Sequence, residues 1–290
     1  MNESHNQLID MAELTAEEIQ ARVLHRDGLM LVIDKPAGIP VHRGPKGGAN
    51  LEASFDALRF GLPRPPALAH RLDRDTSGCL VLGRHRKATA SLGLLFKHGK
   101  ISKTYWAVVE GGPAEDEGTV NIPLGRLNEE RGWWQKPDPN GLPSITRWKV
   151  LGRSPLDTSP SVGEVEREAC GSEVNASGTE AAVHPFPESS PASGKGVQFT
   201  WLSLEPLTGR THQLRVHCAA MGWPIAGDGI YGTQASLRRL HNEQYIPRFG
   251  EPSLHLHARE IAIPLSKNKP PVVVTAPVPA HLHALLKVCG

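Results

Sequence analysis

One short segment, residues 70–81, constrains the fold more than any other part of the chain. It holds a His, two Arg, two Asp, a Thr and a Ser within eight residues, and the apolar run Cys79-Leu80-Val81-Leu82-Gly83 follows directly. This order predicts a polar loop that leads into a buried strand, and loops held by a rigid scaffold often carry catalytic side chains. The alternative is a surface turn, in which Asp75 and Thr76 hydrogen-bond their own backbone and Gly78 supplies a positive φ.

A second polar segment follows an alternating strand predicted at residues 197–206. Residues 208–217, Thr-Gly-Arg-Thr-His-Gln-Leu-Arg-Val-His, begin with a turn signal and continue into a predicted helix. Not all of its long polar side chains can belong to a core, and these are Arg210, His212, Arg215 and His217. Such a cluster at the start of a helix suits an anionic substrate.

Composition argues against several other classes of protein. With 290 residues and 39% hydrophobic content, the chain can bury a sizeable core. No stretch approaches the roughly 20 apolar residues that cross a bilayer, and the first 20 residues lack the pattern of a secretory signal. We therefore expect a soluble, cytoplasmic protein. The four cysteines lie far apart without a Cys-x-x-Cys pair, so we expect reduced cysteines and no zinc site.

The charge of the chain is unevenly distributed. The formal net charge is only +2, but residues 71–103 hold eight Lys and Arg against two Asp. A basic stripe beside a candidate site is typical of a protein that binds a phosphate backbone. The alternative interpretation is a solvated helix face, and charge alone does not separate the two.

The length allows one large domain or two modest ones. The resemblance described below implies one domain at residues 23–290, preceded by a flexible arm at 1–22. Residues 153–196 differ in composition, because they are rich in Ser, Pro, Gly and Glu and hold seven acidic against three basic residues. Such a segment buries too little apolar surface to offset the entropy of ordering it. We predict a disordered acidic insertion that joins two strands of the domain.

Local patterns also predict the other elements. An Asp-Gly turn joins two strands within residues 23–33, which indicates a hairpin. Helices are expected at 51–60 and 87–100 from the spacing of their apolar residues. Strands are expected at 103–109, 260–264 and 272–276, and Thr15 with Glu18 has the spacing of a capping box.

Three residues between these elements allow two interpretations. Lys35, in a Lys-Pro-x-Gly loop, could reach a phosphate or cap the loop, and the second is favoured. Trp133 and Trp134 could stack on bases, as aromatic platforms do in proteins that bind single-stranded nucleic acid. A core or hinge role is the favoured interpretation for this adjacent pair.

The two polar segments resemble the signatures of the RluA-type RNA pseudouridine synthases, His-Arg-Leu-Asp-x-x-Thr-Ser-Gly and Thr-Gly-Arg-Thr-His-Gln-Leu-Arg-Val-His. Residues 103–107, 224–232 and 254–258 continue the resemblance. It implies an α+β fold, the pseudouridine synthase catalytic fold, with a mixed, mostly antiparallel bent β-sheet, flanking helices and a central basic cleft. The 22 residues before Val23 are too few for the small RNA-binding domain of larger members, so we expect a catalytic domain alone.

The resemblance also implies a reaction, the isomerisation of uridine to pseudouridine in a tRNA or rRNA stem-loop, after base flipping and with no cofactor or metal. Asp73 would be the catalytic carboxylate, as nucleophile or base, with Arg215 as its cationic partner. Tyr105 would be a third catalytic residue, packed on the uracil and able to assist loss of the C5 proton. Arg71 would fill the space that the flipped base leaves. Other expected RNA contacts are His70, Arg74, Thr76, Lys103, Arg210 and His212. We expect a monomer.

Three other functions compete with this one. A catalytically inactive RNA-binding protein of the same fold would show damage at Asp73, Arg215 or Tyr105, and all three are intact. A nucleoside or glycoside hydrolase would use Asp73 with Asp75, but two carboxylates on one tight loop seldom flank a single bond. A zinc deaminase would need Cys and His ligands that the chain lacks.

Overall fold

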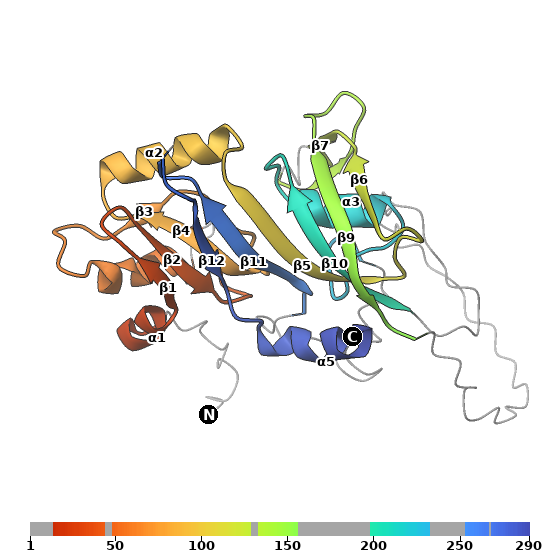
Figure 1. The fold of residues 1–290 in the computed structure, drawn as a ribbon, viewed down its shortest axis with the longest axis horizontal. Coiled ribbons are helices and arrows are strands. Elements are labelled where there is room, and N and C mark those ends of the chain that lie inside the picture. The colour runs from red at the N-terminus through yellow and green to blue at the C-terminus, as the bar shows by residue number, and fades with distance from the viewer. Residues whose placement is uncertain (1–13, 44–47, 129–132, 156–197, 233–252, 267) are drawn as a thin grey trace, which may run out of the picture.

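The computed structural model describes residues 14–43, 48–128, 133–155, 198–232, 253–266 and 268–290. In this part of the chain ten strands form one sheet, and its main order is β1-β2-β4-β11-β5-β10-β9-β6. Figure 1 shows this sheet running across the molecule, with helices on its two faces. The strands are β1 (Val23–Arg26), β2 (Met30–Lys35), β3 (Ala67–Leu68), β4 (Ser77–Gly83), β5 (Ser102–Glu110), β6 (Glu117–Asn121), β9 (Ile145–Arg153), β10 (Phe199–Pro206), β11 (Leu256–Ile263) and β12 (Val272–Thr275).

The sheet is mixed and mostly antiparallel, as expected. β4 and β11 pair in parallel, while the other pairings within the described sheet are antiparallel. A separate two-stranded ribbon consists of β7 (Leu124–Arg126) and β8 (Gln135–Pro137). The helical elements are α1 (Ala16–Ala21), the 3-10 helix η1 (Leu51–Leu58), α2 (Arg86–Lys97), α3 (Gln213–Ala220) and α5 (Ala280–Cys289).

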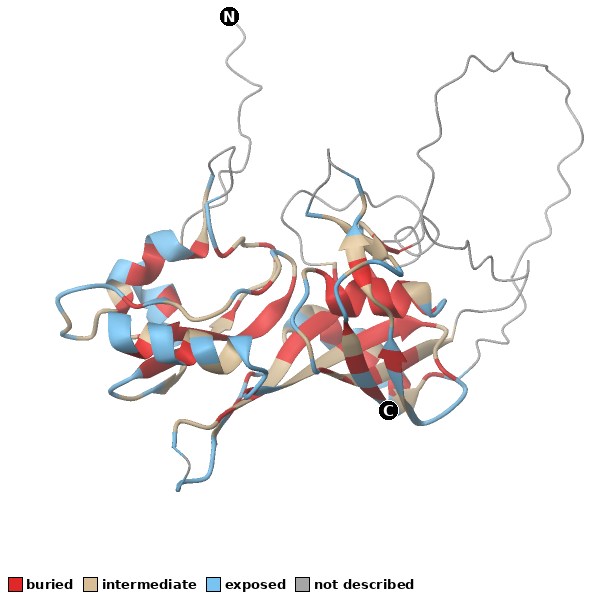
Figure 2. Cartoon of the chain, turned by 90° about the horizontal axis from the view of Figure 1, so that it is seen from above, coloured by how far each residue is buried: buried red, intermediate tan, exposed pale blue. Residues whose placement is uncertain are grey.

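Both faces of the half of the sheet that contains β2 and β4 are buried. Successive strand side chains point to opposite faces, so Leu31 and Ile33 pack under α1 and η1, while Met30 and Val32 pack with α2 on the other face. This explains why β4 reads as an unbroken apolar run in the sequence, since all seven of its residues are buried. Figure 2 shows the exposed residues on the outer sides of these helices.

The other half of the sheet is built around β5 and β10. Leu214 and Cys218 of α3 pack against one face, and Leu282 and Leu286 of α5 pack against the other, where they meet Val108. β10 ends at Pro206 and α3 begins at Gln213. The second polar segment therefore lies between a buried strand and a buried helix, which limits its freedom to move.

Two predicted segments, the arm at 1–22 and the helix at 51–60, differ in the structure. Residues 14–22 are not a flexible arm, because the predicted capping box forms at Thr15 and Glu18, and Ile19 of α1 is fully buried in the core. Residues 1–13 lie outside the described residues. The segment at 51–60 folds as a 3-10 helix over Leu51–Leu58, and its apolar residues are buried as predicted.

The predicted insertion lies mostly outside the described residues, which exclude 156–197. Its first residue, Arg153, belongs to β9. β9 and β10 are antiparallel neighbours, so the segment does join two paired strands of one sheet. Next to Arg153, the Oγ of Ser154 accepts a hydrogen bond from the Phe199 amide at 2.8 Å, which ties the two ends of the connection together.

Candidate active site

A buried lysine holds the first polar loop, which leads from β3 into β4. Lys35 is fully buried, and its ammonium donates hydrogen bonds to the carbonyl oxygens of Pro36, Arg74 and Thr76 at 2.8, 2.8 and 2.9 Å. It therefore caps the loop and does not reach a phosphate, in line with the favoured interpretation. Burial lowers the pKa of Lys35 to about 7, against the attraction of the nearby carboxylates.

Gly78 fixes the point where this loop becomes a strand. Its φ is +103°, and a Cβ at this position would collide with the carbonyl oxygen of Ala258 on β11. Only glycine allows this backbone conformation and this close approach together. The loop before it turns tightly, since the Thr76 amide donates to the Asp73 carbonyl at 3.2 Å. The Asp73 side chain consequently stands at a defined place above the sheet.

Arg215 on α3 connects the second polar segment to the first. Its Nε and Nη2 donate to the two carboxylate oxygens of Asp228 at 2.7 and 2.6 Å, and its Nη1 lies 3.9 Å from Oδ2 of Asp73. Asp228 also accepts from the amides of Ile230 and Tyr231. The expected pairing of Arg215 with Asp73 is thus within ion-pair distance, but the hydrogen bonds go to Asp228.

Asp228 is a residue of the site to which the sequence assigned no role. It lies in the Gly-Asp-Gly segment at 227–229, which reads locally as a turn. Burial would raise the pKa of Asp228, but the charge and hydrogen bonds of Arg215 lower it below the ordinary range. Burial likewise opposes the charge on Arg215, and Asp228 raises the pKa of the guanidinium above its usual value. Both side chains are therefore ionised.

His212 lies between these ions and a tyrosine. It caps α3 from a left-handed backbone conformation, with φ +53°, which is unfavourable for a residue with a Cβ. Its Nδ1 is 2.8 Å from the hydroxyl of Tyr231, and its Nε2 is 3.9 Å from Oδ2 of Asp73. Burial lowers the pKa of His212, although the charge of Asp73 opposes this shift. At 3.9 Å the ring makes no hydrogen bond to Asp73, so its contact in the structure is with Tyr231.

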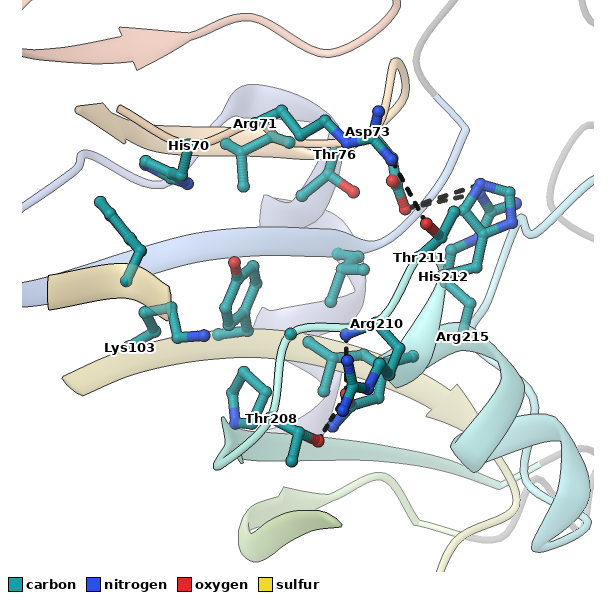
Figure 3. A pocket seen from close by; sticks show the side chains of 18 of the residues that line it. His70, Arg71, Asp73, Thr76, Lys103, Thr208, Arg210, Thr211, His212 and Arg215 are labelled. Carbon is teal, nitrogen blue, oxygen red and sulfur yellow. Dashed lines mark hydrogen bonds and ion pairs between the residues drawn. The ribbon is translucent and has the colours of Figure 1, made fainter. Parts of the chain in front are cut away.

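A cavity of about 400 Å³ brings the two polar segments together, as Figure 3 shows. Its walls carry five Lys or Arg residues and one acid, Asp73, so the expected basic cleft is present; the five are Arg71, Lys97, Lys103, Arg210 and Arg215. Nine of the ten residues that the sequence placed in the site line it: His70, Arg71, Asp73, Thr76, Lys103, Tyr105, Arg210, His212 and Arg215. The tenth, Arg74, forms a two-point ion pair with Asp75 and lines a neighbouring cavity instead.

Among these residues, His70, Lys103 and Tyr105 are half-buried. His70 accepts a hydrogen bond from the Val81 amide at 3.0 Å and stacks on Phe96, so its contacts in the structure shape the loop. Burial lowers the pKa of His70 to about 3. Burial also raises the pKa of Tyr105 well above that of a free phenol and lowers the pKa of Lys103.

The outer end of the cavity is exposed to solvent. The Arg71 side chain crosses to the second polar segment, where Nη2 donates to the Thr211 hydroxyl at 3.3 Å. Arg210 is exposed and donates to the Pro143 carbonyl at 3.2 Å. Not all of the basic stripe is free for a ligand, because Arg84 is held by the carbonyl oxygens of Asp27 and Phe60. His217, from the second polar segment, is a core residue that contacts Thr146.

Two further findings concern metals and membranes. Among the described residues, no group of three or more His, Cys, Asp or Glu side chains could hold a metal ion. The described cysteines, Cys79, Cys218 and Cys289, are buried and unpaired by disulfides, while Cys170 lies outside this part of the chain. None of the described helices is long and apolar enough to cross a membrane.

Comparison with known proteins identifies the family. The family described as RNA pseudouridylate synthase matches residues 29–220. An uncharacterized RNA pseudouridine synthase of Zymomonas mobilis is 35% identical over 260 residues, which cover 89% of this chain and 94% of that protein. A ribosomal large subunit pseudouridine synthase C of Vibrio cholerae is 32% identical, with 93% of this chain and 69% of that protein covered.

The solved structure of human RNA pseudouridylate synthase domain containing 1 superposes with a TM-score of 0.61 at 25% identity, over 94% of this chain and 90% of that one. The architecture, the two signatures and these relatives agree. The chain therefore belongs to the RluA-type family of RNA pseudouridine synthases, the isomerases that form pseudouridine in RNA.

Proposed function

We propose that this enzyme isomerises specific uridines of tRNA, rRNA or both, with Asp73 as the catalytic carboxylate. One observation carries the proposal: among the described residues, Asp73 is the only acid beside five cationic residues on a cavity of about 400 Å³. That volume lies within the range of sites for small ligands. The basic walls suit a phosphate backbone, and the lone carboxylate suits a reaction at the ribose.

The reaction exchanges one bond for another. The bond between uracil N1 and ribose C1′ breaks, a bond between C5 and C1′ forms, hydrogen leaves C5, and N1 takes up a proton. Nothing is oxidised or reduced. A carboxylate can begin this sequence by attacking C1′ or by removing a ribose proton, and both routes need an ionised Asp73 beside the sugar. Arg215, 3.9 Å away and almost fully buried, stabilises that charge.

Tyr105 takes the role of packing against the uracil ring. Its side chain lines the cavity together with Lys103 and residues of the second polar segment. Because burial raises the pKa of Tyr105, the phenol stays protonated at neutral pH. A protonated phenol is a poor base for the C5 proton, so we assign Tyr105 to holding the ring in place.

A uridine in a folded RNA reaches this cavity after it leaves the base stack, at a cost of roughly a few kcal/mol. Arg71 is exposed, and within the described part of the chain its hydrogen bond is the long one to Thr211, at 3.3 Å. This side chain is free to enter the space that the flipped base leaves. Arg210 and Lys103 would contact the backbone of a stem-loop, and we place this reaction in the cytoplasm with a monomeric enzyme.

The test compares two aspartates. Asp56 of η1 pairs with Arg59 and lines neither this cavity nor the neighbouring one, so Asp56→Asn is a control for Asp73→Asn. Each purified variant is incubated with tRNA and rRNA labelled with tritium at uracil C5, and release of tritium to water is followed. We expect release by the wild type and by Asp56→Asn, and none above background from Asp73→Asn.

Turnover by Asp73→Asn would refute the assignment of Asp73. Absence of release from the wild type with both RNAs, while binding remains measurable, would favour a catalytically inactive RNA-binding protein. The RNA that releases tritium identifies the substrate class. Circular dichroism of the three proteins controls for loss of the fold.

A further inference from the structure

Trp133 is an exposed aromatic ring beside the active site. The favoured interpretation of the Trp133 and Trp134 pair is a core or hinge role, and the core role is wrong for Trp133, which is 59% exposed. Among the large hydrophobic residues that lie exposed in the described part of the chain, it is the one aromatic. Leaving an indole in water forgoes the stabilisation that burial brings. The position of this ring therefore calls for a contact outside the core.

Trp133 lines a second cavity, of about 340 Å³, next to the first. The two cavities share a wall that includes Arg71, Asp73, His212 and Arg215. Asp73 thus lies on the boundary between them. Tyr105 lines only the first cavity and Trp133 only the second, so aromatic rings stand on both sides of the catalytic carboxylate.

His212 lies between Trp133 and Asp73. Its ring centroid is 5.7 Å from that of His212, with the two rings nearly perpendicular, and Nε2 of His212 is 3.9 Å from Asp73. The backbone just after it is anchored. The Trp134 carbonyl accepts from the Leu127 amide at 2.9 Å, and the Gln135 amide donates to the Tyr231 hydroxyl at 3.0 Å.

We propose that Trp133 forms a second base-binding subsite, in which it stacks on the base of the nucleotide adjacent to the target uridine. This inference rests on the proposed function, because it takes the target base to fill the first cavity beside Tyr105. The RNA strand continues past Asp73 and its next base enters the second cavity. Val41 and Ile230 provide apolar walls there, and Arg71 provides a cation for the intervening phosphate.

Stacking on Trp133 would add affinity for RNA without specificity for one base. Every base has a π-face, so stacking tolerates any sequence, and its loss on substitution by Ala is worth about 1–3 kcal/mol in other proteins. That range corresponds to a change of about 5- to 150-fold in a dissociation constant. The anchored backbone at 134–135 keeps the ring in place before RNA arrives, which reduces the entropy lost on binding.

The first experiment measures tritium release from bulk RNA by Trp133→Ala, Trp133→Phe and Leu142→Ala. Leu142 is a matched control because it is also 59% exposed but lines neither cavity. We expect Trp133→Ala to raise KM about 5- to 150-fold, and Trp133→Phe to stay within about 3-fold of the wild type because it keeps a ring. Leu142→Ala should match the wild type.

The second experiment does not require turnover. It compares the binding of pentauridylate with that of a pentamer of abasic ribose phosphates, so that their ratio of affinities reports on the bases alone. Trp133→Ala should lower this ratio and leave the affinity for the abasic pentamer unchanged. An equal loss for both oligomers, or no loss for either, would overturn the subsite.

The two experiments separate this inference from the function on which it rests. If the wild type releases tritium while Trp133→Ala changes neither KM nor the ratio, the subsite is refuted and the isomerase assignment stands. If no variant releases tritium but the ratio falls in Trp133→Ala, the base contact stands and the assignment of Asp73 falls.

Discussion

Substitution of Asp228 by Asn tests how the active-site arginine is held. The Oδ1 atom of Asp228 accepts from Arg215 Nη2 and from the amides of Ile230 and Tyr231, while Oδ2 accepts from Arg215 Nε. Asn keeps the first oxygen but replaces the second with an amide nitrogen. Two donors would then face each other where a hydrogen bond of 2.7 Å exists now.

The size of the effect follows from burial. The side chains of Arg215 and Asp228 are 4% and 1% exposed, and removing one partner of a buried ion pair costs roughly 3–5 kcal/mol. Asp73 cannot replace Asp228, because it is 3.9 Å from the guanidinium and its side chain is 29% exposed. At about 2–4 °C per kcal/mol for a protein of this size, Asp228→Asn should lower Tm by roughly 10 °C.

Thermal unfolding followed by circular dichroism, with Asp73→Asn as the control, measures this difference. Both substitutions remove a carboxylate next to the same arginine, but Asp73→Asn should change Tm by less than about 3 °C, since its partly exposed ion pair contributes roughly 1 kcal/mol or less. Equal Tm losses, or a Tm for Asp228→Asn within about 2 °C of the wild type, would refute the reasoning.

The pH dependence gives a second check on the same pair. The pKa of Asp228 in the folded chain is below its ordinary value of 3.8, so its contribution to stability is present above that pH and is lost as pH falls through the lower value. Asp228→Asn lacks this contribution at every pH. The gap in the free energy of unfolding between wild type and variant should therefore narrow in acid.

Two further predictions concern residues that support the first signature loop. The pKa of His70 in the folded chain is about 3, below its ordinary 6.5, so the chain takes up a proton on unfolding between these pH values. The free energy of unfolding therefore decreases as the pH is lowered through this range, by at most about 1.4 kcal/mol per pH unit. In His70→Gln, the free energy of unfolding measured by urea titration should change less steeply with pH between pH 4 and 7. An unchanged pH dependence would contradict the lowered pKa. Gly78→Ala should reduce the yield of soluble protein, because φ +103° and the nearby Ala258 carbonyl both exclude a Cβ; a folded variant with wild-type Tm would disprove this.

Elements with a strong local pattern could be predicted from the sequence. The hairpin at 23–33, the helix at 87–100 and the final strand pair are all present, with α2 ending at Lys97. Local patterns could not supply the order of the sheet, where β4 pairs in parallel with β11, far away in the sequence. That pairing depends on packing across the whole domain, which no short window records.

The candidate site shows the same division. Residues inside the two signatures line one cavity, which the resemblance implied and local patterns alone did not. The sequence assigned no role to Asp228, because a Gly-Asp-Gly segment is typical of a turn. Its contact with Arg215 of α3 becomes visible only in the folded chain. Trp133 was misjudged for a related reason: an adjacent pair of tryptophans has no periodicity, so nothing local tells which ring is exposed.

The connection between β9 and β10 has a practical consequence. Ser154 and Phe199 are hydrogen-bonded at its start. The second signature begins just beyond the opposite end of β10, a strand of eight residues that extends over roughly 26 Å. A change in the length of this connection therefore leaves Asp73 and Arg215 where they are. Because the connection lies outside both signatures in the sequence, it is the place to insert a fluorescent label or a surface tether.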